Sequence, residues 1–395
     1  MNELFYVLIP SIIAFACTCW IHPYILKVAK VKNIVDNPDA RKLQRVPVPL
    51  LGGLTVVFGI LSGLMVVNLS SCHFDLFPVF ASIIIILIVG LIDDMISLSP
   101  KVRFFVEIIL VVYLIGTTGW QLNGFHGLWG LEVIPNYISI PLTVFACVGI
   151  INAINLIDGV DGYSSGYSIV SCIIFGVMFY ELGNIHMVAL AAVVAASLLP
   201  FFLHNVFGKH SKMFIGDAGT LSLGIIFSTF VITILSANQN IEVLQDNLGL
   251  IPFALAVLCV PIFDTLRVMG ARIVRGKSPF SPDKTHLHHL FIDLGYSHIG
   301  TTLSIIGINL FVVFCWFIAY KWGLSIDMQL YIVVTLGVFV TFIFYPFVKK
   351  QIRKESGAYY SLRKVAKLTH ADRKGFWLFV QEWVDKSVTE EIRDL

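Results

Sequence analysis

Eleven long apolar stretches run through this chain of 395 residues, and they restrict its fold more than any other feature. A helix needs about 20 apolar residues to cross about 30 Å of hydrocarbon, whereas strands of a membrane barrel show only a weak alternation over about ten residues. Continuous runs of this length predict helices. We therefore predict an all-α polytopic integral membrane protein with about eleven transmembrane helices, near residues 5–27, 50–68, 77–92, 102–119, 137–154, 167–182, 186–204, 219–237, 249–270, 300–320 and 328–347.

The composition excludes several classes of protein. Hydrophobic residues make up 57% of the chain and charged residues only 13%, against about 25% charged residues in soluble domains. The 27 basic and 25 acidic residues nearly balance, so we expect no nucleic acid as a partner. The seven cysteines have no CxxC spacing, which indicates neither a disulfide framework nor a zinc site.

The basic residues predict which way the chain crosses the membrane. If the N-terminus is extracytoplasmic, every Lys and Arg except Lys321 lies on the opposite side, and cytoplasmic loops collect such residues. We therefore predict a cytoplasmic C-terminus. Acidic residues at the cytoplasmic helix ends then locate any chemistry on the inner face; they are Asp36, Asp93, Asp94, Asp158, Asp161, Asp217, Asp264 and Asp283.

The first polar motif is Gly90-Leu-Ile-Asp93-Asp94. Two adjacent carboxylates at the end of a membrane helix repel each other and are costly to desolvate, so they need a cation or a shared proton. A divalent metal or a catalytic base is implied. The alternative is a pair of acidic residues solvated in the headgroup layer.

The second motif runs from Asn152 to Gly162. Asn152, Asn155 and Asp158 are three residues apart and share one helix face, while the glycines permit a sharp turn that directs Asp158 and Asp161 into one site. A simple turn is the alternative, because Asn, Asp and Gly are the usual turn residues.

The third motif is Met213-Phe-Ile-Gly-Asp-Ala-Gly-Thr220. Asp217 between glycines can approach a metal and phosphate closely, since Mg²⁺ takes one or two carboxylates plus phosphate oxygens. Phe214 offers a face on which a nucleobase could stack. An aspartate that caps the following helix is the alternative.

The longest cytoplasmic loop, residues 267–299, is rich in basic groups. Arg offers a bidentate fork to phosphate, and His donates hydrogen bonds or carries protons. This set predicts a pyrophosphate site, although Arg272 and Arg275 also suit a plain headgroup anchor. The candidates in this loop are Arg272, Arg275, His286, His288 and His289.

The first cytoplasmic loop, which contains Asp36 and Arg41, is basic, rich in proline and ends in Gly52-Gly53. It could hold an anionic lipid headgroup. Together the loops supply carboxylates for a metal, basic groups for phosphates and an aromatic face for a base, which phosphoryl transfer requires. The membrane setting makes a lipid substrate the expectation.

The blocks GLIDD, NAINLIDGVDG, MFIGDAGTLSLG and SPFSPDKTHLHH, in this order, resemble the polyprenyl-phosphate N-acetylhexosamine-1-phosphate transferase superfamily. The resemblance covers residues 1–347, with a basic, amphipathic cytoplasmic tail at 348–395. The HLHH block and the eleventh helix look closer to the bacterial undecaprenyl-phosphate GlcNAc-1-phosphate transferases than to the phospho-MurNAc-pentapeptide translocases.

The resemblance implies a reaction at the cytoplasmic face of the bacterial inner membrane. HexNAc-1-phosphate, most simply GlcNAc-1-phosphate, would pass from a UDP-N-acetylhexosamine to undecaprenyl phosphate, with Mg²⁺ or Mn²⁺ as cofactor and UMP as the second product. This step would initiate a cell-envelope glycan such as an O antigen, teichoic acid or capsule. The superfamily also makes a homodimer plausible.

Residue roles carried over by motif are as follows. Asp217 and Asp94 would bind the metal, and Asp93 would act as base. Asp93 and Asp94 would both serve the lipid phosphate. The second motif and Phe214 would hold the nucleotide sugar, the His and Arg residues of the long loop would hold the pyrophosphate and sugar, and two residues would belong to a first-loop site; the positions are Asn152, Asn155, Asp158, Asp161, Phe214, His286, His288, His289, Arg272, Arg275, Asp36 and Arg41.

Several alternatives stay open at this stage. The lipid phosphate could attack directly, or the reaction could pass through a phospho-aspartyl enzyme. The donor could be UDP-GalNAc or another acetamido sugar. A cation-coupled transporter is the main rival class, because intramembrane carboxylates also line ion paths, and a catalytically silent scaffold is a third. The tail could be an interfacial helix, a protein-docking segment or a flexible end.

Overall fold

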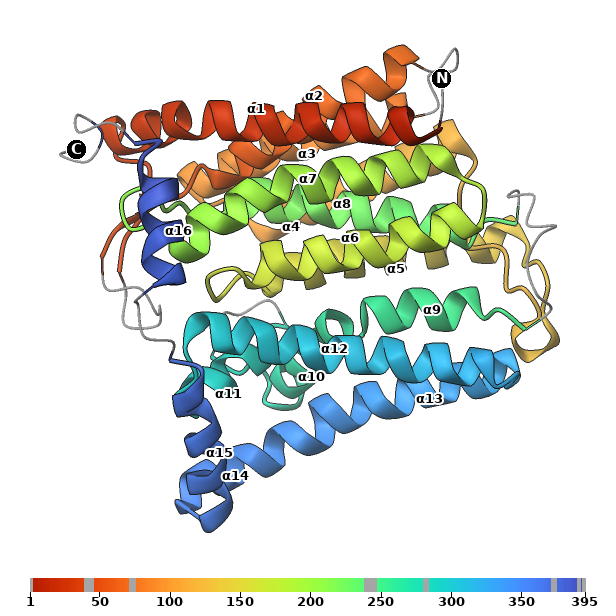
Figure 1. Cartoon of the computed structure of the whole chain (residues 1–395). Coiled ribbons are helices and arrows are strands. Elements are labelled where there is room, and N and C mark those ends of the chain that lie inside the picture. The colour runs from red at the N-terminus through yellow and green to blue at the C-terminus, as the bar shows by residue number, and fades with distance from the viewer. Residues whose placement is uncertain are drawn as a thin grey trace. The chain divides into compact units, whose positions relative to one another are not determined.

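The computed structural model describes residues 3–38, 46–70, 76–237, 247–279, 284–370, 375–388 and 392. Nearly all of the regular structure is helical (Figure 1). The two short strands, β1 (Val35–Asp36) and β2 (Val48–Pro49), pair in antiparallel fashion. The chain forms two compact units: the first comprises Met1–Trp120, Val144–Phe230 and Asp372–Leu395, and the second comprises Gln121–Thr143 and Val231–Ala371.

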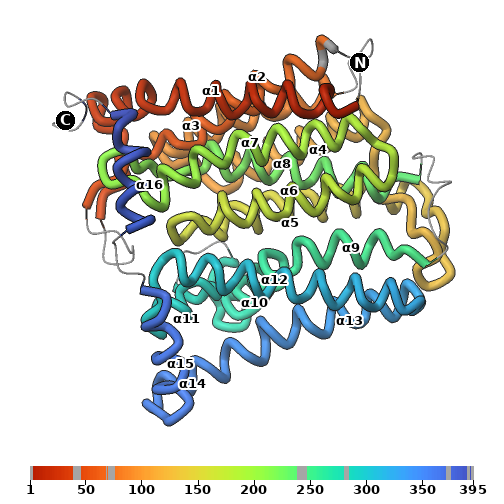
Figure 2. The backbone as a smooth tube through the Cα atoms, viewed as in Figure 1, coloured from red at the N-terminus to blue at the C-terminus, as the bar shows by residue number. Residues whose placement is uncertain are grey.

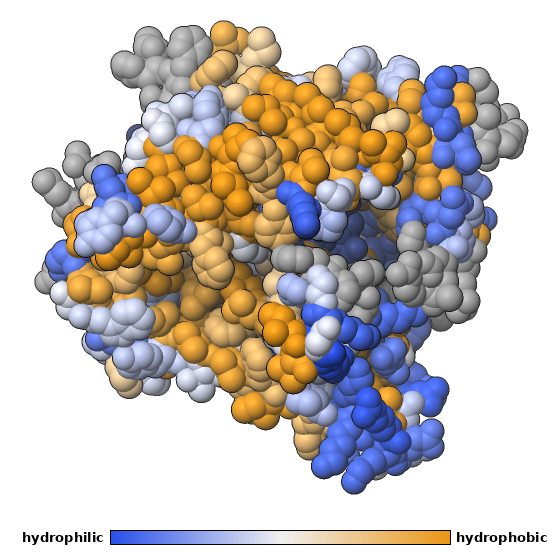
Figure 3. Space-filling model, turned by 180° about the vertical axis from the view of Figure 1, so that it is seen from behind, coloured by the Kyte–Doolittle hydropathy of each residue, from blue (hydrophilic) through white to orange (hydrophobic). Residues whose placement is uncertain are grey.

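Each of the eleven apolar stretches falls on one helix or on consecutive helical elements, so the prediction of a helical multi-pass membrane protein is confirmed. Among the described residues, eight helices are long and apolar enough to cross a membrane, and a bent pair makes a possible ninth. The larger number, eleven spans, and the orientation of the termini remain predictions. Most of the face in Figure 3 is hydrophobic, and hydrophilic residues gather on the segment that holds α14 (Tyr345–Lys354) and α15 (Gly357–Leu368).

The first unit is a bundle around one enclosed helix. That helix is α8 (Gly216–Ile234), and almost all of its side chains are buried. Its neighbours approach closely where they carry glycine: a Cβ at Gly53 would lie 2.2 Å from the Gly219 nitrogen, and one at Gly90 would lie 2.4 Å from the Ala218 Cα. Small residues permit such contact between membrane helices. The other helices of this unit are α1 (Glu3–Val31), α2 (Gly52–Ser70), α3 (Phe77–Ile96), α4 (Pro100–Thr118), α6 (Tyr163–Glu181), α7 (Ile185–Phe207), α16 (Phe376–Asp385) and most of α5 (Asn136–Leu156).

The second unit contains a broken helix, where one continuous span was expected. Helices α9 (Leu250–Val257) and α10 (Cys259–Val274) meet at 72°, and the trace in Figure 2 turns sharply there. Asn309 satisfies the freed backbone groups, since its Oδ1 accepts the Val260 N–H at 3.0 Å and its Nδ2 donates to the Val257 carbonyl at 2.9 Å. Apolar surroundings tolerate a break only with such replacement partners.

The rest of the second unit consists of helices that pack beside this broken pair. Helix α12 (His298–Lys321) carries Asn309 and contacts both α9 and α10. The π-helical segment η2 (Phe339–Phe344) joins α13 (Ile326–Val338) to α14, and so continues the last apolar stretch beyond residue 347. The remaining elements are η1 (Leu128–Gly130) and α11 (Leu287–Asp293).

Candidate active site

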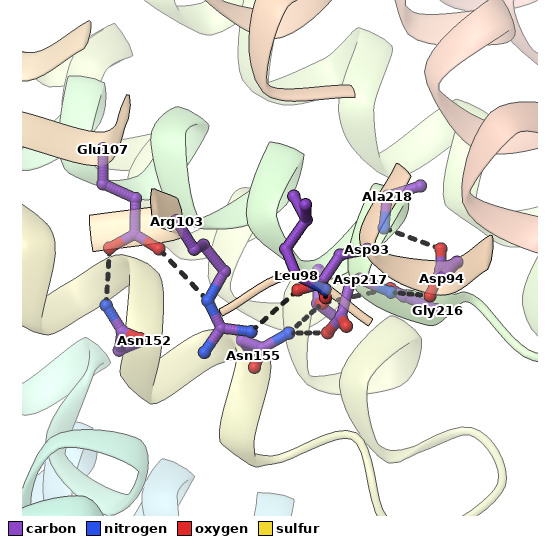
Figure 4. Close-up of polar contacts among 11 residues, drawn as sticks. Asp93, Asp94, Leu98, Arg103, Glu107, Asn152, Asn155, Gly216, Asp217 and Ala218 are labelled. Atoms are coloured by element: carbon purple, nitrogen blue, oxygen red, sulfur yellow. Dashed lines mark hydrogen bonds and ion pairs between the residues drawn. The ribbon is translucent and has the colours of Figure 1, made fainter. Parts of the chain in front are cut away.

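Asp94, at the end of α3, caps the start of α8. Its two carboxylate oxygens accept the backbone N–H groups of Asp217 at 2.8 Å and of Ala218 at 3.0 Å (Figure 4). Gly216 adopts a φ of 64°, and a Cβ there would lie 2.6 Å from the Asp94 carboxylate. A carboxylate is favoured at a helix N-terminus, where unpaired N–H groups and the helix dipole attract negative charge. Asp94 therefore fixes the backbone position of Asp217.

Asp93, the neighbour of Asp94, points to a different environment. Its Oδ1 accepts the Leu98 N–H at 2.7 Å and its Oδ2 accepts from Arg103 at 3.2 Å. The Asp217 carboxyl lies beside that of Asp93 and also accepts from Asn155 at 2.5 Å. Asn155 directs its second N–H to Thr220, which lies one turn into α8. The site thus holds two facing carboxyl groups, each oriented by its own donors.

Arg103 and Glu107 complete this cluster. Glu107 is fully buried on α4; its Oε2 accepts from the Asn152 amide at 2.6 Å, and its Oε1 lies 3.6 Å from the Arg103 Nε. Neither residue belongs to the four sequence motifs, so neither was predicted as part of the site. A signal did exist, because an acidic residue inside an apolar helix is costly and marks a functional partner.

The four polar residues of the second motif have different partners in the structure. Asn155 contacts the Asp217 carboxyl directly, whereas Asn152 is buried and binds Glu107. Asp158 accepts a hydrogen bond from Ser164 at 2.6 Å, and Asp161 forms an ion pair with Lys212 at 2.6 Å. Asp158 and Asp161 lie on the loop that follows α5.

The loop before α8 lies beside that second-motif loop. Asn205 joins them, as its Oδ1 accepts the Gly162 N–H at 2.7 Å and its Nδ2 donates to the Met213 carbonyl at 2.8 Å. The Lys212 ammonium lies 5.6 Å from the centre of the Phe214 ring. Lys212 had been counted only as a basic loop residue, and its role depends on this fold.

The first loop is anchored to the same place. The Phe214 N–H donates to the Pro49 carbonyl at 2.8 Å, and the Gly52 N–H donates to the Phe214 carbonyl at 2.9 Å. Strand β2 therefore holds the backbone of Phe214. Asp36 is half-buried on the partner strand β1. Arg41 lies outside the described residues.

In the second unit, Asp264 organises the His-rich motif. It accepts hydrogen bonds from the His286 Nδ1 at 2.9 Å and from the Leu287 N–H at 3.1 Å, and it pairs with Arg267 at 2.6 Å. The Arg267 guanidinium also lies 3.7 Å from the centre of the Tyr345 ring. Neither Asp264 nor Arg267 had been assigned a role, because 22 residues separate Asp264 from His286.

These contacts fix the orientation of the His286 ring. Because Nδ1 donates to a carboxylate, Nε2 is left as the free position of the imidazole. Nε2 is buried and makes no hydrogen bond within the part of the chain that the structure describes.

The other predicted residues of this loop differ in exposure. His288 is buried, and burial, followed by the neighbouring His289 and His286, lowers its pKa well below the usual value. His289 is half-buried, with its ring centre 4.3 Å from that of His288. Arg272 is buried and donates to the Pro279 carbonyl at 2.5 Å, while Arg275 is exposed at the end of α10.

The pair of Asp93 and Asp217 fits a divalent cation. Two carboxylates this close in a largely buried site need positive charge between them, and Mg²⁺ typically takes one or two carboxylates and completes its shell with phosphate and water. A complete cage of protein ligands is not expected for Mg²⁺. Among the described residues, no group of three or more His, Cys, Asp or Glu side chains could hold a metal by itself.

Comparison with known proteins identifies the family of this chain. The family model of glycosyl transferase family 4 matches residues 76–235, which include Asp93, Asp94 and Asp217. The undecaprenyl-phosphate α-N-acetylglucosaminyl 1-phosphate transferase of Yersinia pestis is 30% identical over 274 residues, 69% of this chain and 73% of that protein.

Two further relatives give the same result. A probable undecaprenyl-phosphate N-acetylglucosaminyl 1-phosphate transferase of Bacillus subtilis is 31% identical over 301 residues, 76% of this chain and 81% of that protein. The undecaprenyl-phosphate α-N-acetylglucosaminyl 1-phosphate transferase of Escherichia coli K12 is 31% identical over 277 residues, 69% of this chain and 72% of that protein. With identities of this size over most of both chains, and with the four motifs in place, this membrane protein belongs to glycosyl transferase family 4.

Proposed function

We propose that this protein transfers GlcNAc-1-phosphate from UDP-GlcNAc to undecaprenyl phosphate, which gives undecaprenyl-pyrophosphoryl-GlcNAc and UMP. The observation that carries the proposal is the facing pair of Asp93 and Asp217, oriented by Arg103 and Asn155 at the start of a buried helix. The names of the relatives support the two substrates.

The reaction requires one bond to form and one to break. An oxygen of the lipid phosphate attacks the β-phosphorus of the nucleotide sugar, and the bond from that phosphorus to the bridging oxygen breaks, so that UMP leaves with the electron pair. A phosphate monoester is largely ionised near neutral pH. Asp93 would take up the remaining proton and orient the attacking group, while positioning and charge stabilisation supply most of the acceleration.

Asp217 is the proposed metal ligand, with Asp93 beside it. Bound Mg²⁺, or Mn²⁺, would supply positive charge to the pyrophosphate oxygens. Asp94 was expected to bind the metal as well, and its oxygens face the α8 amides. We therefore propose that Asp94 acts by holding Asp217 in place.

Substrate groups would be bound by the loops already described. In the first unit, Asp158, Asp161 and Phe214 are the proposed residues for the sugar nucleotide, with Phe214 stacked on uracil. In the second unit, basic groups are proposed for the pyrophosphate; they are Arg272, Arg275, His286, His288 and His289. Arg275 is exposed, whereas Arg272 is buried and also donates to the Pro279 carbonyl of its own loop.

The setting of the reaction is also part of the proposal. The basic loops support a cytoplasmic active site in the bacterial inner membrane, and the product would start a cell-envelope glycan. UDP-GalNAc and modified hexosamines are the competing donors.

The test is UMP release by the purified protein in detergent, with undecaprenyl phosphate, Mg²⁺ and a panel of UDP-N-acetylhexosamines. We expect release that depends on the lipid, stops with EDTA and is fastest with UDP-GlcNAc. Glu181→Gln removes an exposed negative charge far along the chain from the motifs and should behave as the wild type. UMP release with a different sugar alone would change the assigned donor. If the folded protein released no UMP with any donor, the proposal that it is this transferase would be refuted.

A further inference from the structure

The C-terminal segment, of which residues 375–388 and 392 are described, contacts the loop that leads into α8. This loop, residues 208–215, carries Lys212 and Phe214 and ends two residues before Asp217. Three of its backbone N–H groups donate to a single carboxylate, that of Asp385 at the end of α16: Lys209 at 3.2 Å, His210 at 3.1 Å and Ser211 at 3.0 Å. The Ser211 hydroxyl donates to it as well, at 2.8 Å.

The position of Asp385 is unfavourable for α16 itself. An acidic residue in the last turn of a helix faces the negative end of the helix dipole, and Asp385 is only 6% exposed, so water cannot screen the charge. Hydrogen bonds to a charged acceptor are stronger than neutral ones, and here four of them offset the cost. The buried charge of Asp385 is therefore stabilised by the 209–211 loop and not by the helix that carries the aspartate.

Apolar contacts hold the segment against the same unit. Its buried apolar side chains recur every fourth residue, and the Trp377 ring lies 4.5 Å from that of Phe207, the last residue of α7. Figure 1 shows α16 lying across the ends of α1 and α7 rather than along them. The Lys30 ammonium donates to the Ile392 carbonyl at 2.6 Å. The buried apolar residues of the segment are Val380, Val384, Val388 and Ile392.

Residues outside the C-terminal segment also bind this loop. The Ser211 carbonyl bonds to the His22 ring nitrogen Nε2 at 2.8 Å. The next residue, Lys212, pairs with Asp161, and the Met213 carbonyl accepts from Asn205. Each residue from 209 to 214 therefore has a polar contact, and the run ends at the start of α8.

We propose that Asp385 is a positioning residue, which holds the 209–211 backbone so that Lys212 and Phe214 meet the nucleotide part of the substrate. This inference rests on the proposed function, because it assigns the loop to nucleotide binding. The tail would then be part of the active unit of this chain, through Asp385 and the loop that it holds.

The test uses the full-length protein and Asp385→Asn, whose amide retains one acceptor but turns an NH₂ group toward the backbone donors. We expect the KM for the UDP-sugar to rise about tenfold, the size of effect that loss of one charged hydrogen bond produces, with a much smaller change in kcat. Glu382→Gln, an exposed residue of the same helix, is the matched control and should leave both values unchanged.

A second readout does not depend on activity. Trypsin cuts after Lys209 and Lys212 only when the loop opens, so Asp385→Asn should be cut there about tenfold faster than the wild type or the control. In a double-mutant cycle, the effects of Asp385→Asn and Lys212→Gln on KM, expressed as free energies, should not be additive. If Asp385→Asn fails to fold, Ser211→Ala removes one of the four bonds and should show the same changes to a smaller extent.

The outcomes separate the two proposals. Faster cleavage with unchanged KM and kcat would make Asp385 a purely structural residue and overturn the inference, as would wild-type behaviour in both assays. Absence of UMP release from the wild-type protein would refute the proposed function, and with it the positioning role, even if trypsin showed that the tail restrains the loop.

Discussion

The Oδ1 of Asp94 accepts the backbone N–H of Asp217 over 2.8 Å, so the end of α3 and the start of α8 are joined at the residue proposed to bind the metal. Asp93, one position earlier on α3, instead lies beside the Asp217 side chain. Consecutive residues of a helix point about 100° apart. Changes at Asp93 and at Asp94 should therefore have separable effects on activity and on stability.

Asp217→Asn should lose at least about a hundredfold in kcat, because charge stabilisation at the reacting phosphate is commonly worth that much. The amide keeps the shape of the side chain and one acceptor for Asn155, so the melting temperature in detergent should change little. Initial rates of UMP release and thermal unfolding of the same preparation check both points. A folded variant with normal turnover would remove Asp217 from the metal role.

The main effect of Asp94→Ala should instead be a loss of protein stability. It leaves the N–H groups of Asp217 and Ala218 without their charged acceptor, which is worth about 2 kcal/mol. The melting temperature should therefore fall more than in Asp217→Asn. The activity of the protein that remains folded should fall as well, because the Asp217 backbone is no longer held. Equal melting temperatures for the two variants would contradict the capping role.

Glu107→Ala should be among the most damaging changes outside the four motifs. Glu107 pairs with Arg103. Removal of one partner of a buried charged pair typically destabilises a protein by about 4 kcal/mol. Glu107→Gln retains an acceptor for the Asn152 amide and should lose less. The double variant Glu107→Ala with Asn152→Ala should be less destabilised than the sum of the single variants, measured by unfolding in detergent; simple additivity would show that the two side chains do not interact.

His288 should make stability depend on pH. Burial lowers its folded-state pKa well below the usual value, so the unfolded chain binds a proton that the folded protein does not. Stability is then complete above the unfolded pKa of about 6.5 and falls with acidification below it, by about 1.4 kcal/mol per pH unit. His288→Gln should flatten the melting temperature between pH 7.5 and 5.5. An unchanged slope would assign that dependence to other groups.

The sequence was sufficient to predict the helical membrane fold, because burial in hydrocarbon demands long apolar runs whatever the packing. It could not predict the bend at Leu258, since both halves are apolar and the replacement partner, Asn309, lies on another helix. The boundary expected at residue 347 stays a prediction, and helix α14 continues across it.

The four motifs likewise predicted which loops carry the polar groups, but not how they interact. Asp93 and Asp94 looked alike in the sequence, and only the position of α8 assigns them different partners. Glu107, Lys212, Asp264 and Asp385 were missed as site residues because each acts on a residue far along the chain. Spacing along one helix does not contain such information.

The most direct test of the central claim follows the β-phosphate itself. UDP-GlcNAc labelled with ³²P at the β-phosphate would be incubated with the protein, undecaprenyl phosphate and Mg²⁺, and the organic and aqueous phases would then be counted. We predict label in the organic phase, attached to lipid together with the sugar, and an equal amount of unlabelled UMP in water. Label that stays in water as UDP while the lipid gains sugar would show glycosyl transfer instead, and would contradict the proposed reaction.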